Sequence, residues 1–199
     1  MVKALYLNFS EYDAFFVAQW RISIYNGSIN QRKGGFFMDF KKLYIDGQWV
    51  APLSGQYIDV ENPATKEVFK TVAAAGEQDV AAASAAAAKA FPAWAARPME
   101  ERIDFMRKLL KELIQFEPQM VDATVKELGI PVSFVKTNHI AYQFVRTQSY
   151  IDLAPDLPLV EKLPQSVVYR RPLGVIGCIT PWNYPLGQVI QKVIPAILV

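Results

Sequence analysis

The stretch that decides the fold is residues 174–186, with the sequence GVIGCITPWNYPL. Its first part, 174–180, is almost entirely apolar, which is typical of a strand buried on both faces in a parallel sheet. The pattern of residues 185–198 predicts a helix that Pro195 kinks or ends. Ligands of open α/β sheets bind beyond the carboxyl ends of the strands, where the turn 181–185 would lie. The sequence therefore predicts an α/β fold with a ligand site at this turn.

Two roles are open for the asparagine of this turn. Asn183 lies two residues before Pro185, where its side chain could cap the following helix by accepting a backbone N–H bond. Trp182 beside it is typical of a core or interface anchor. Gly174 and Gly177 do not form a G-x-G-x-x-G fingerprint, so nucleotide binding does not follow from them. Residue chemistry alone favours a structural role for Asn183.

The chain before this stretch predicts hairpins followed by helices. Asp-Gly at 46–47 and a proline turn at 62–65 each separate two β-prone runs. Apolar spacing, acidic first turns and a glycine cap then predict a series of helices. The expected elements are hairpins over 43–50 and 57–72, helices over 77–91, 100–116, 118–128 and 135–153, a connecting loop marked by prolines 155, 158 and 164, and a strand over 166–170.

The overall composition is that of an ordinary globular protein. With 52% hydrophobic residues, 20% charged residues and a net charge of +2, the chain has neither the basic stripe of a nucleic-acid binder nor an acidic tail. Residues 173–199 are apolar, but they contain three prolines, an asparagine, two glutamines and a lysine, so no membrane span is predicted. Cys178 is the only cysteine, which excludes an internal disulfide and favours the cytoplasm. No metal site is predicted.

Residues 1–37 differ from the rest of the chain. They contain none of its 13 prolines and show no sustained helical or alternating pattern. Lys33-Gly34-Gly35 can be encoded by a purine-rich run of the kind found in bacterial ribosome-binding sites, two codons before Met38. We expect either a leader translated from upstream sequence, with Met38 as the natural start, or a genuine disordered or docking extension.

Several motifs in order resemble one family. Residues 171–186, RPLGVIGCITPWNYPL, resemble the P-x-G-V-x-x-x-I-x-P-W-N-[FY]-P motif of the aldehyde dehydrogenase superfamily. Earlier landmarks agree with it: YIDGQW at 44–49, NPAT at 62–65, Trp94 with Glu101-Arg102, and ELG at 127–129. The resemblance covers about residues 42–199 and leaves 1–37 aside.

This resemblance implies a fold and a site. The fold is the N-terminal part of the aldehyde dehydrogenase fold, incomplete, with β-hairpins, a helical stretch and the start of a Rossmann-like parallel sheet over 38–199. Carried over, Asn183 is an oxyanion-hole donor, and Ile179, Thr180, Pro181 and Trp182 contact NAD or NADP. The implied reaction oxidises an aldehyde to a carboxylic acid, in an enzyme that forms a homo-oligomer when full length.

Much of the catalytic machinery implied by the resemblance would lie beyond Val199. The nucleophilic cysteine and the general-base glutamate are among the missing groups, so the chain is expected to be inactive alone. Cys178 is a poor substitute, because a thiol in an apolar strand is inert. His139, the sole histidine, has the pattern of a structural or surface residue. The alternative to part of an enzyme is a non-catalytic remnant that packs on a full-length homologous subunit.

Overall fold

The structure, a computed structural model, describes residues 14–16 and 40–199. Its strands are β1 (Ala14–Phe16), β2 (Leu43–Ile45), β3 (Gln48–Val50), β4 (Tyr57–Glu61), β5 (Val68–Ala73), β6 (Val160–Leu163), β7 (Ser166–Tyr169) and β8 (Gly177–Ile179). Its helices are α1 (Glu77–Ala95), α2 (Met99–Gln115), α3 (Glu117–Leu128), α4 (Val132–Phe134), the π-helix η2 (Val135–Ala141), α5 (Tyr142–Leu153), the 3₁₀ turn η3 (Ala154–Asp156) and α6 (Pro185–Leu198). Apart from 14–16, the leader expected at 1–37 lies outside the described residues.

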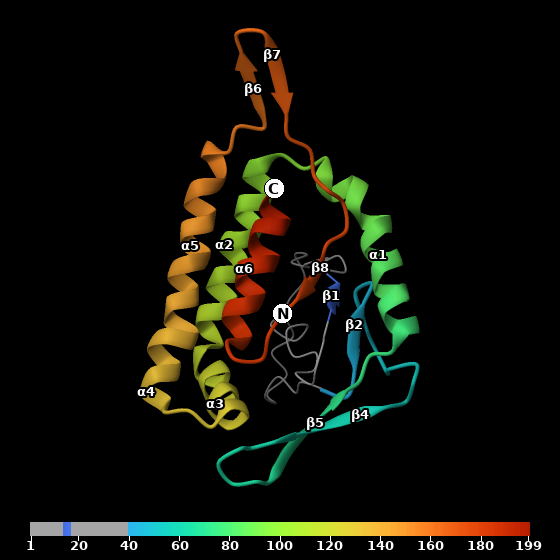
Figure 1. The fold of residues 1–199 in the computed structure, drawn as a ribbon, viewed down its shortest axis with the longest axis vertical. Coiled ribbons are helices and arrows are strands. Elements are labelled where there is room, and N and C mark those ends of the chain that lie inside the picture. Colours follow the sequence, from blue (N-terminus) through green and yellow to red (C-terminus); the bar gives the residue numbers. More distant parts are fainter. Residues whose placement is uncertain (1–13, 17–39) are drawn as a thin grey trace, which may run out of the picture.

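Helices α2, α5 and α6 lie side by side and form the main core (Figure 1). Apolar side chains recur along α2 at three- and four-residue steps and face the other two helices. Fully buried members of this core include Ile103, Leu113, Ile151, Ile190 and Ile194. The predicted helix over 100–116 is thus confirmed, and α6 is held by packing along its length.

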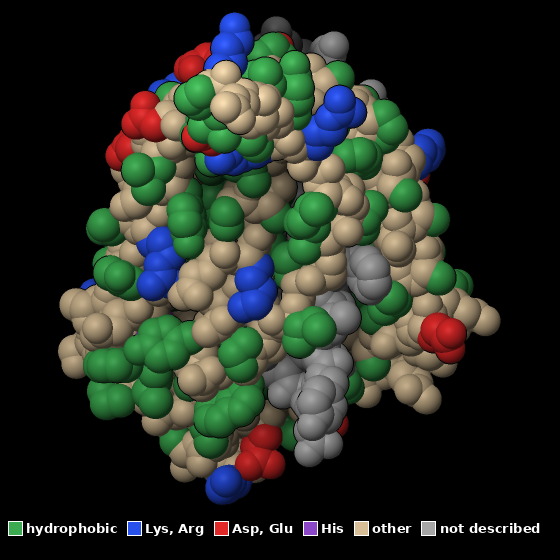
Figure 2. Space-filling view, turned by 45° about the horizontal axis from the view of Figure 1, so that its top comes forward, with side chains coloured by type: hydrophobic (Ala, Val, Ile, Leu, Met, Phe, Trp, Pro, Cys, Tyr) green, Lys and Arg blue, Asp and Glu red, His purple; other side chains and the backbone are tan. Residues whose placement is uncertain are grey.

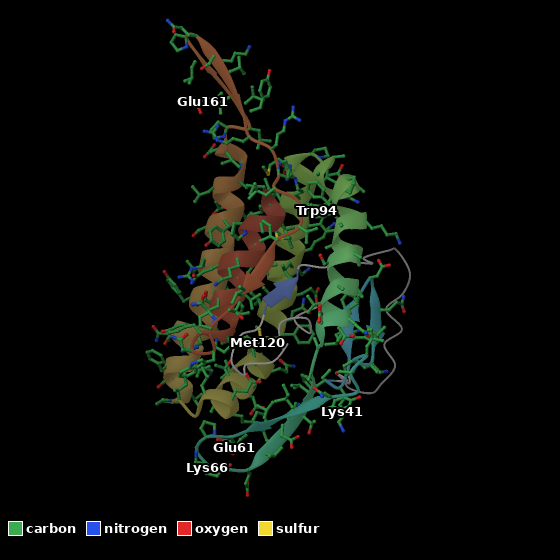
Figure 3. The ribbon with its side chains drawn as sticks, turned by 45° about the vertical axis from the view of Figure 1, so that its right-hand side comes forward. Lys41, Glu61, Lys66, Trp94, Met120 and Glu161 are labelled. Carbon is green, nitrogen blue, oxygen red and sulfur yellow. The ribbon has the colours of Figure 1, made fainter. Side chains whose placement is uncertain are left out.

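Helix α1 stands apart from this layer, and hydrogen bonds fix both of its ends (Figures 1 and 3). The buried carboxylate of Asp79 accepts backbone N–H bonds from Gly76 at 2.9 Å and Leu53 at 3.1 Å, which fixes the start of the helix. At the other end, the Trp94 Nε1–H donates to the carbonyl of Ile197 at 3.0 Å. The alanine-rich helix therefore contacts the end of α6.

Both predicted N-terminal hairpins are confirmed. β2 pairs antiparallel with β3, and β4 with β5. Asp46 and Gly47 have φ values of 48° and 78°, which a two-residue I′ turn requires. In the second turn, Asn62 Oδ1 accepts the backbone N–H of Ala64 at 2.9 Å.

The connecting loop expected around residues 155–164 is wrong in its second half. Residues 160–163 form β6, which pairs antiparallel with β7 across a turn at Pro164-Gln165. This hairpin projects beyond the helices (Figure 1), and Arg170 Nη2 bonds Glu161 Oε2 at 2.9 Å near its base. The prediction failed because proline is common both in loops and in tight turns, and Pro164 lies in the tight turn between two strands.

Strand β8 differs from the strand predicted at 174–180. Only Gly177–Ile179 is extended in a ladder, its partner is β1 in antiparallel register, and Ile179 is 62% exposed while Cys178 is buried. The expectation of burial on both faces is therefore wrong among the described residues. A parallel strand pair is joined by a crossover, usually a helix, that leads into the second strand. In the described residues, β8 and α6 are the first strand and the helix of such a unit.

The end of α3 gives the first testable prediction. Gly129 has φ +63°, and a Cβ there would lie 2.8 Å from Pro63 Cγ. Gly129→Ala should lower the free energy of unfolding by more than about 1–2 kcal/mol, because the left-handed backbone penalty and the clash add. The matched control is Gly55→Ala, with φ +64° and no atom within 4 Å of the added Cβ.

Urea denaturation of both variants tests this prediction. We expect the larger loss for Gly129→Ala. Equal losses would mean that the contact between Pro63 and the end of α3 is not formed.

Candidate active site

The turn at 181–185 connects β8 to α6. Its first three side chains are exposed, whereas Tyr184 is half-buried and Pro185 is buried. Ile179 is 62% exposed and Trp182 is 65% exposed, and Pro181 and Asn183 are exposed as well. Pro185 stands in the first turn of α6, where its fixed φ suits a helix start. The carboxyl end of β8 therefore carries an exposed apolar surface beside one free carboxamide.

The capping role considered for Asn183 is wrong. The residue at the N-cap of α6 is Tyr184, and no side chain caps that helix. Within the described part of the chain, the carboxamide of Asn183 has no hydrogen-bond partner. Its amide protons are thus available to a bound group.

Thr180 is placed differently from its neighbours. Its side chain is only 7% exposed, and its Oγ1 is buried without a hydrogen-bond partner among the described residues. Ile179, Pro181 and Trp182 instead expose apolar surface. The Thr180 hydroxyl is therefore turned away from that exposed surface.

The π-helix η2 packs against the turn through His139 and Tyr184, and its π geometry was not predicted from the sequence. The helix expected over 135–153 exists, but it begins at Val132 and has π geometry over Val135–Ala141. His139 on η2 is 3% exposed, and burial lowers the pKa of its imidazole. This burial supports the predicted structural role of His139 and not a surface role. No pattern in the sequence predicted that His139 lies beside the turn.

Cys178 does not qualify as a nucleophile. Its side chain is 1% exposed, and burial raises the pKa of the thiol, with Lys192 opposing the shift. A thiol without appreciable thiolate is unreactive, so Cys178 contributes to packing.

Glu127 is an unusual carboxyl outside the turn. It lies on α3, its Oε2 is buried without a hydrogen-bond partner in the described chain, and desolvation raises its pKa to about 8 while Lys70 opposes the shift. No pattern in the sequence marks this carboxyl as unusual; the ELG motif at 127–129 was a landmark of the family, and its glycine caps α3. This carboxyl is protonated at neutral pH and bears on stability.

A pocket of about 370 Å³ lies elsewhere, between α1, the end of α6 and residues 170–176. It is lined mainly by apolar side chains and includes none of residues 179–183. Over residues 14–16 and 40–199, no helix is long and apolar enough to cross a membrane, and no cluster of three metal-ligating side chains is found.

Comparisons with known proteins agree with the motifs and the fold. The family model described as "Aldehyde dehydrogenase family" matches residues 49–199. A Staphylococcus epidermidis protein named as an aldehyde dehydrogenase is 34% identical over 158 residues, which cover 79% of this chain and 33% of that protein. The chain spans about a third of the length of the curated relatives it matches.

Solved structures agree as well. Aldehyde dehydrogenase C of Pseudomonas syringae, a C291A mutant in complex with NAD+ and octanal, superposes with a TM-score of 0.74 at 32% identity, covering 80% of this chain and 33% of the other. A Mycobacterium tuberculosis aldehyde dehydrogenase in complex with NAD+ gives 0.73 at 28% identity, covering 80% and 34%.

The hairpins, the helical layer and the strand–turn–helix unit that carries the exposed asparagine make up a partial mixed α/β fold. The chain belongs to the aldehyde dehydrogenase family, and its structure is the N-terminal portion of that fold.

Proposed function

We propose that this chain works as the N-terminal part of an NAD(P)-dependent aldehyde dehydrogenase and that Asn183 is its catalytic residue. The observation that supports this most is the exposed carboxamide of Asn183, which has no hydrogen-bond partner among the described residues and lies beside the apolar surface of Ile179, Pro181 and Trp182. The NAD+ complexes of the structural neighbours support a nicotinamide cofactor.

In the proposed reaction, a cysteine thiolate from the rest of the enzyme adds to the aldehyde carbon, and the carbonyl oxygen becomes an oxyanion. Asn183 donates an Nδ2–H bond to that oxygen, and as a neutral amide it stabilises the charge without titrating. Ile179, Pro181 and Trp182 would line the bound NAD(P)+, which would supply the hydride acceptor for the oxidation. Water then hydrolyses the thioester to the carboxylic acid, with a glutamate from the rest of the enzyme as base.

We expect the chain alone to be inactive, because no side chain at the turn can serve as the nucleophile or as the general base. Its lone cysteine is consistent with a cytoplasmic location. Exposed apolar residues on the projecting β6–β7 hairpin, among them Val160, Leu163, Val167 and Tyr169, favour a homo-oligomer. Figure 2 shows hydrophobic side chains exposed on one face, most closely grouped at its lower left, with Lys, Arg, Asp and Glu side chains elsewhere on that face.

The proposal is tested in the assembled enzyme, meaning this segment continued into the remaining domains of an aldehyde dehydrogenase, either its native continuation or those of a relative. We expect aldehyde-dependent formation of NADH or NADPH by the assembled enzyme and none by the 199-residue chain. A well-folded assembled enzyme without this activity, or turnover by the chain alone, would contradict the proposal. In the first case, co-purification with a full-length homologous subunit would support the remnant alternative.

A further inference from the structure

An aromatic stack joins η2 to the turn that carries Asn183. The imidazole of His139 lies parallel to the ring of Tyr184, with centroids 4.1 Å apart and an interplanar angle of 8°. Phe134 meets the same imidazole edge-on at 5.6 Å. The imidazole therefore contacts two rings, one of which belongs to the residue next to Asn183.

A second contact holds the first turn of α6 against the same region. A Cβ at Gly187 would lie 3.1 Å from Gln143 Nε2, so the helix backbone lies directly on that side chain. The buried carboxamide of Gln143 is fixed in turn, because it donates to the carbonyl of Asn138 at 3.2 Å and accepts from Arg146 Nη1 at 3.1 Å. The start of α6 thus has little room to shift relative to η2.

The turn itself has few other anchors. Trp182 on one side of Asn183 is 65% exposed, whereas Tyr184 on the other side is partly buried under His139. The Tyr184 carbonyl also accepts the first backbone bond of α6, from the N–H of Gln188 at 2.9 Å. The position of the Asn183 main chain is therefore set mainly from its C-terminal side.

We propose that His139 is a positioning residue, whose stack on Tyr184 fixes the turn so that the carboxamide of Asn183 meets the substrate oxygen. This inference rests on the proposed oxyanion role of Asn183. His139 does not act as a base, because it is 3% exposed and its Nδ1 is buried without a partner among the described residues. π-Helical segments within helices are frequent at functional sites, and η2 is a π-helical segment of 7 residues that leads directly into α5.

The test compares His139→Leu with His139→Phe in the assembled enzyme. Both replacements are apolar, but only phenylalanine retains a flat ring that can stack on Tyr184. We expect His139→Leu to lower kcat by on the order of 10- to 10²-fold, with a smaller change in aldehyde KM, because misplacing a catalytic group affects the chemical step. His139→Phe should retain kcat within about threefold.

Two controls separate positioning from general destabilisation. Ile140→Val, at the fully buried neighbouring position, should leave kcat nearly unchanged although it lowers stability. Hydrogen exchange at the Gln188 amide should be faster in His139→Leu than in His139→Phe, since the turn is released only in the first. Should His139→Leu fail to fold, the comparison is made at Tyr184, which is partly buried. Tyr184→Leu removes the same stack, and Tyr184→Phe keeps it.

A double-mutant cycle completes the test. If the two rings act as one unit, His139→Leu and Tyr184→Leu together should lower kcat no more than either alone. Equal kcat and equal Gln188 exchange in the Leu and Phe variants would overturn the proposal. Faster exchange without a loss of kcat would overturn the positioning role as well. Failure of the oxyanion role is recognised separately, by normal turnover of Asn183→Asp.

Discussion

In the assembled enzyme, Asn183→Asp is expected to lower kcat by at least on the order of 10²- to 10³-fold, which corresponds to about 2.7–4 kcal/mol. A carboxylate has no N–H to donate and places negative charge beside the developing oxyanion. Asn183→Ala should show a loss of similar size through removal of the donor alone. The measurement is kcat under saturating aldehyde and cofactor.

Melting temperature is the control for this prediction. Because no side chain caps α6 and Asn183 is exposed, neither variant should lose appreciable stability. A helix cap lost to alanine would instead cost roughly 1 kcal/mol of stability and leave turnover of the folded enzyme unchanged. Normal kcat in a well-folded Asn183→Asp enzyme would remove Asn183 from the mechanism.

The second large effect is expected for Glu127→Gln, which should be more stable than the parent protein at high pH. Desolvation raises the pKa of this carboxyl from 4.5 to about 8, so the folded protein holds a proton that the unfolded chain releases. The stability that this group contributes is complete below about pH 4.5 and is lost as the pH rises through about 8, at up to about 1.4 kcal/mol per pH unit. Glu127→Gln should abolish that loss.

Urea denaturation at about pH 5 and about pH 8.5 measures the effect. Glu127→Gln should resemble the parent at the lower pH and be clearly more stable at the higher pH. Glu67→Gln, which removes an exposed carboxylate, is the matched control and should change neither value much. A parent and a Glu127→Gln variant with parallel pH dependence would show that the Glu127 carboxyl is ionised in the folded protein.

Local patterns in the sequence predicted most of the elements, and tertiary contacts account for the errors. Asp46-Gly47 specifies its hairpin through backbone φ values, and the apolar spacing of α2 specifies the face that packs in the core. Strand β8 lies within the predicted range 174–180 but is shorter, and its exposure depends on neighbouring strands that no pattern within 174–180 encodes. Strand β6 was missed because proline within four residues of a strand also marks a loop.

At the candidate site, too, some features follow from the sequence and others depend on tertiary contacts. The exposure of Asn183 and the burial of Thr180 depend on how β8 and α6 are joined, which the motif alone does not show. His139 could not be assigned to the site from sequence, since it precedes Tyr184 by a long stretch of chain and only the fold brings the two rings together. Asn183 itself was predicted from the motif of a family and not from residue chemistry, which favoured a cap.

The most direct test of the account is a crystal structure of the assembled enzyme with NAD+ and an aldehyde or an oxyanion analogue bound. We expect Nδ2 of Asn183 at about 2.7–3.1 Å from the substrate oxygen. We also expect the nicotinamide nucleotide against Ile179, Pro181 and Trp182, with the imidazole of His139 still stacked on Tyr184. A substrate oxygen bound away from Asn183, or a cofactor that leaves the surface at 179–182 bare, would contradict the proposed site.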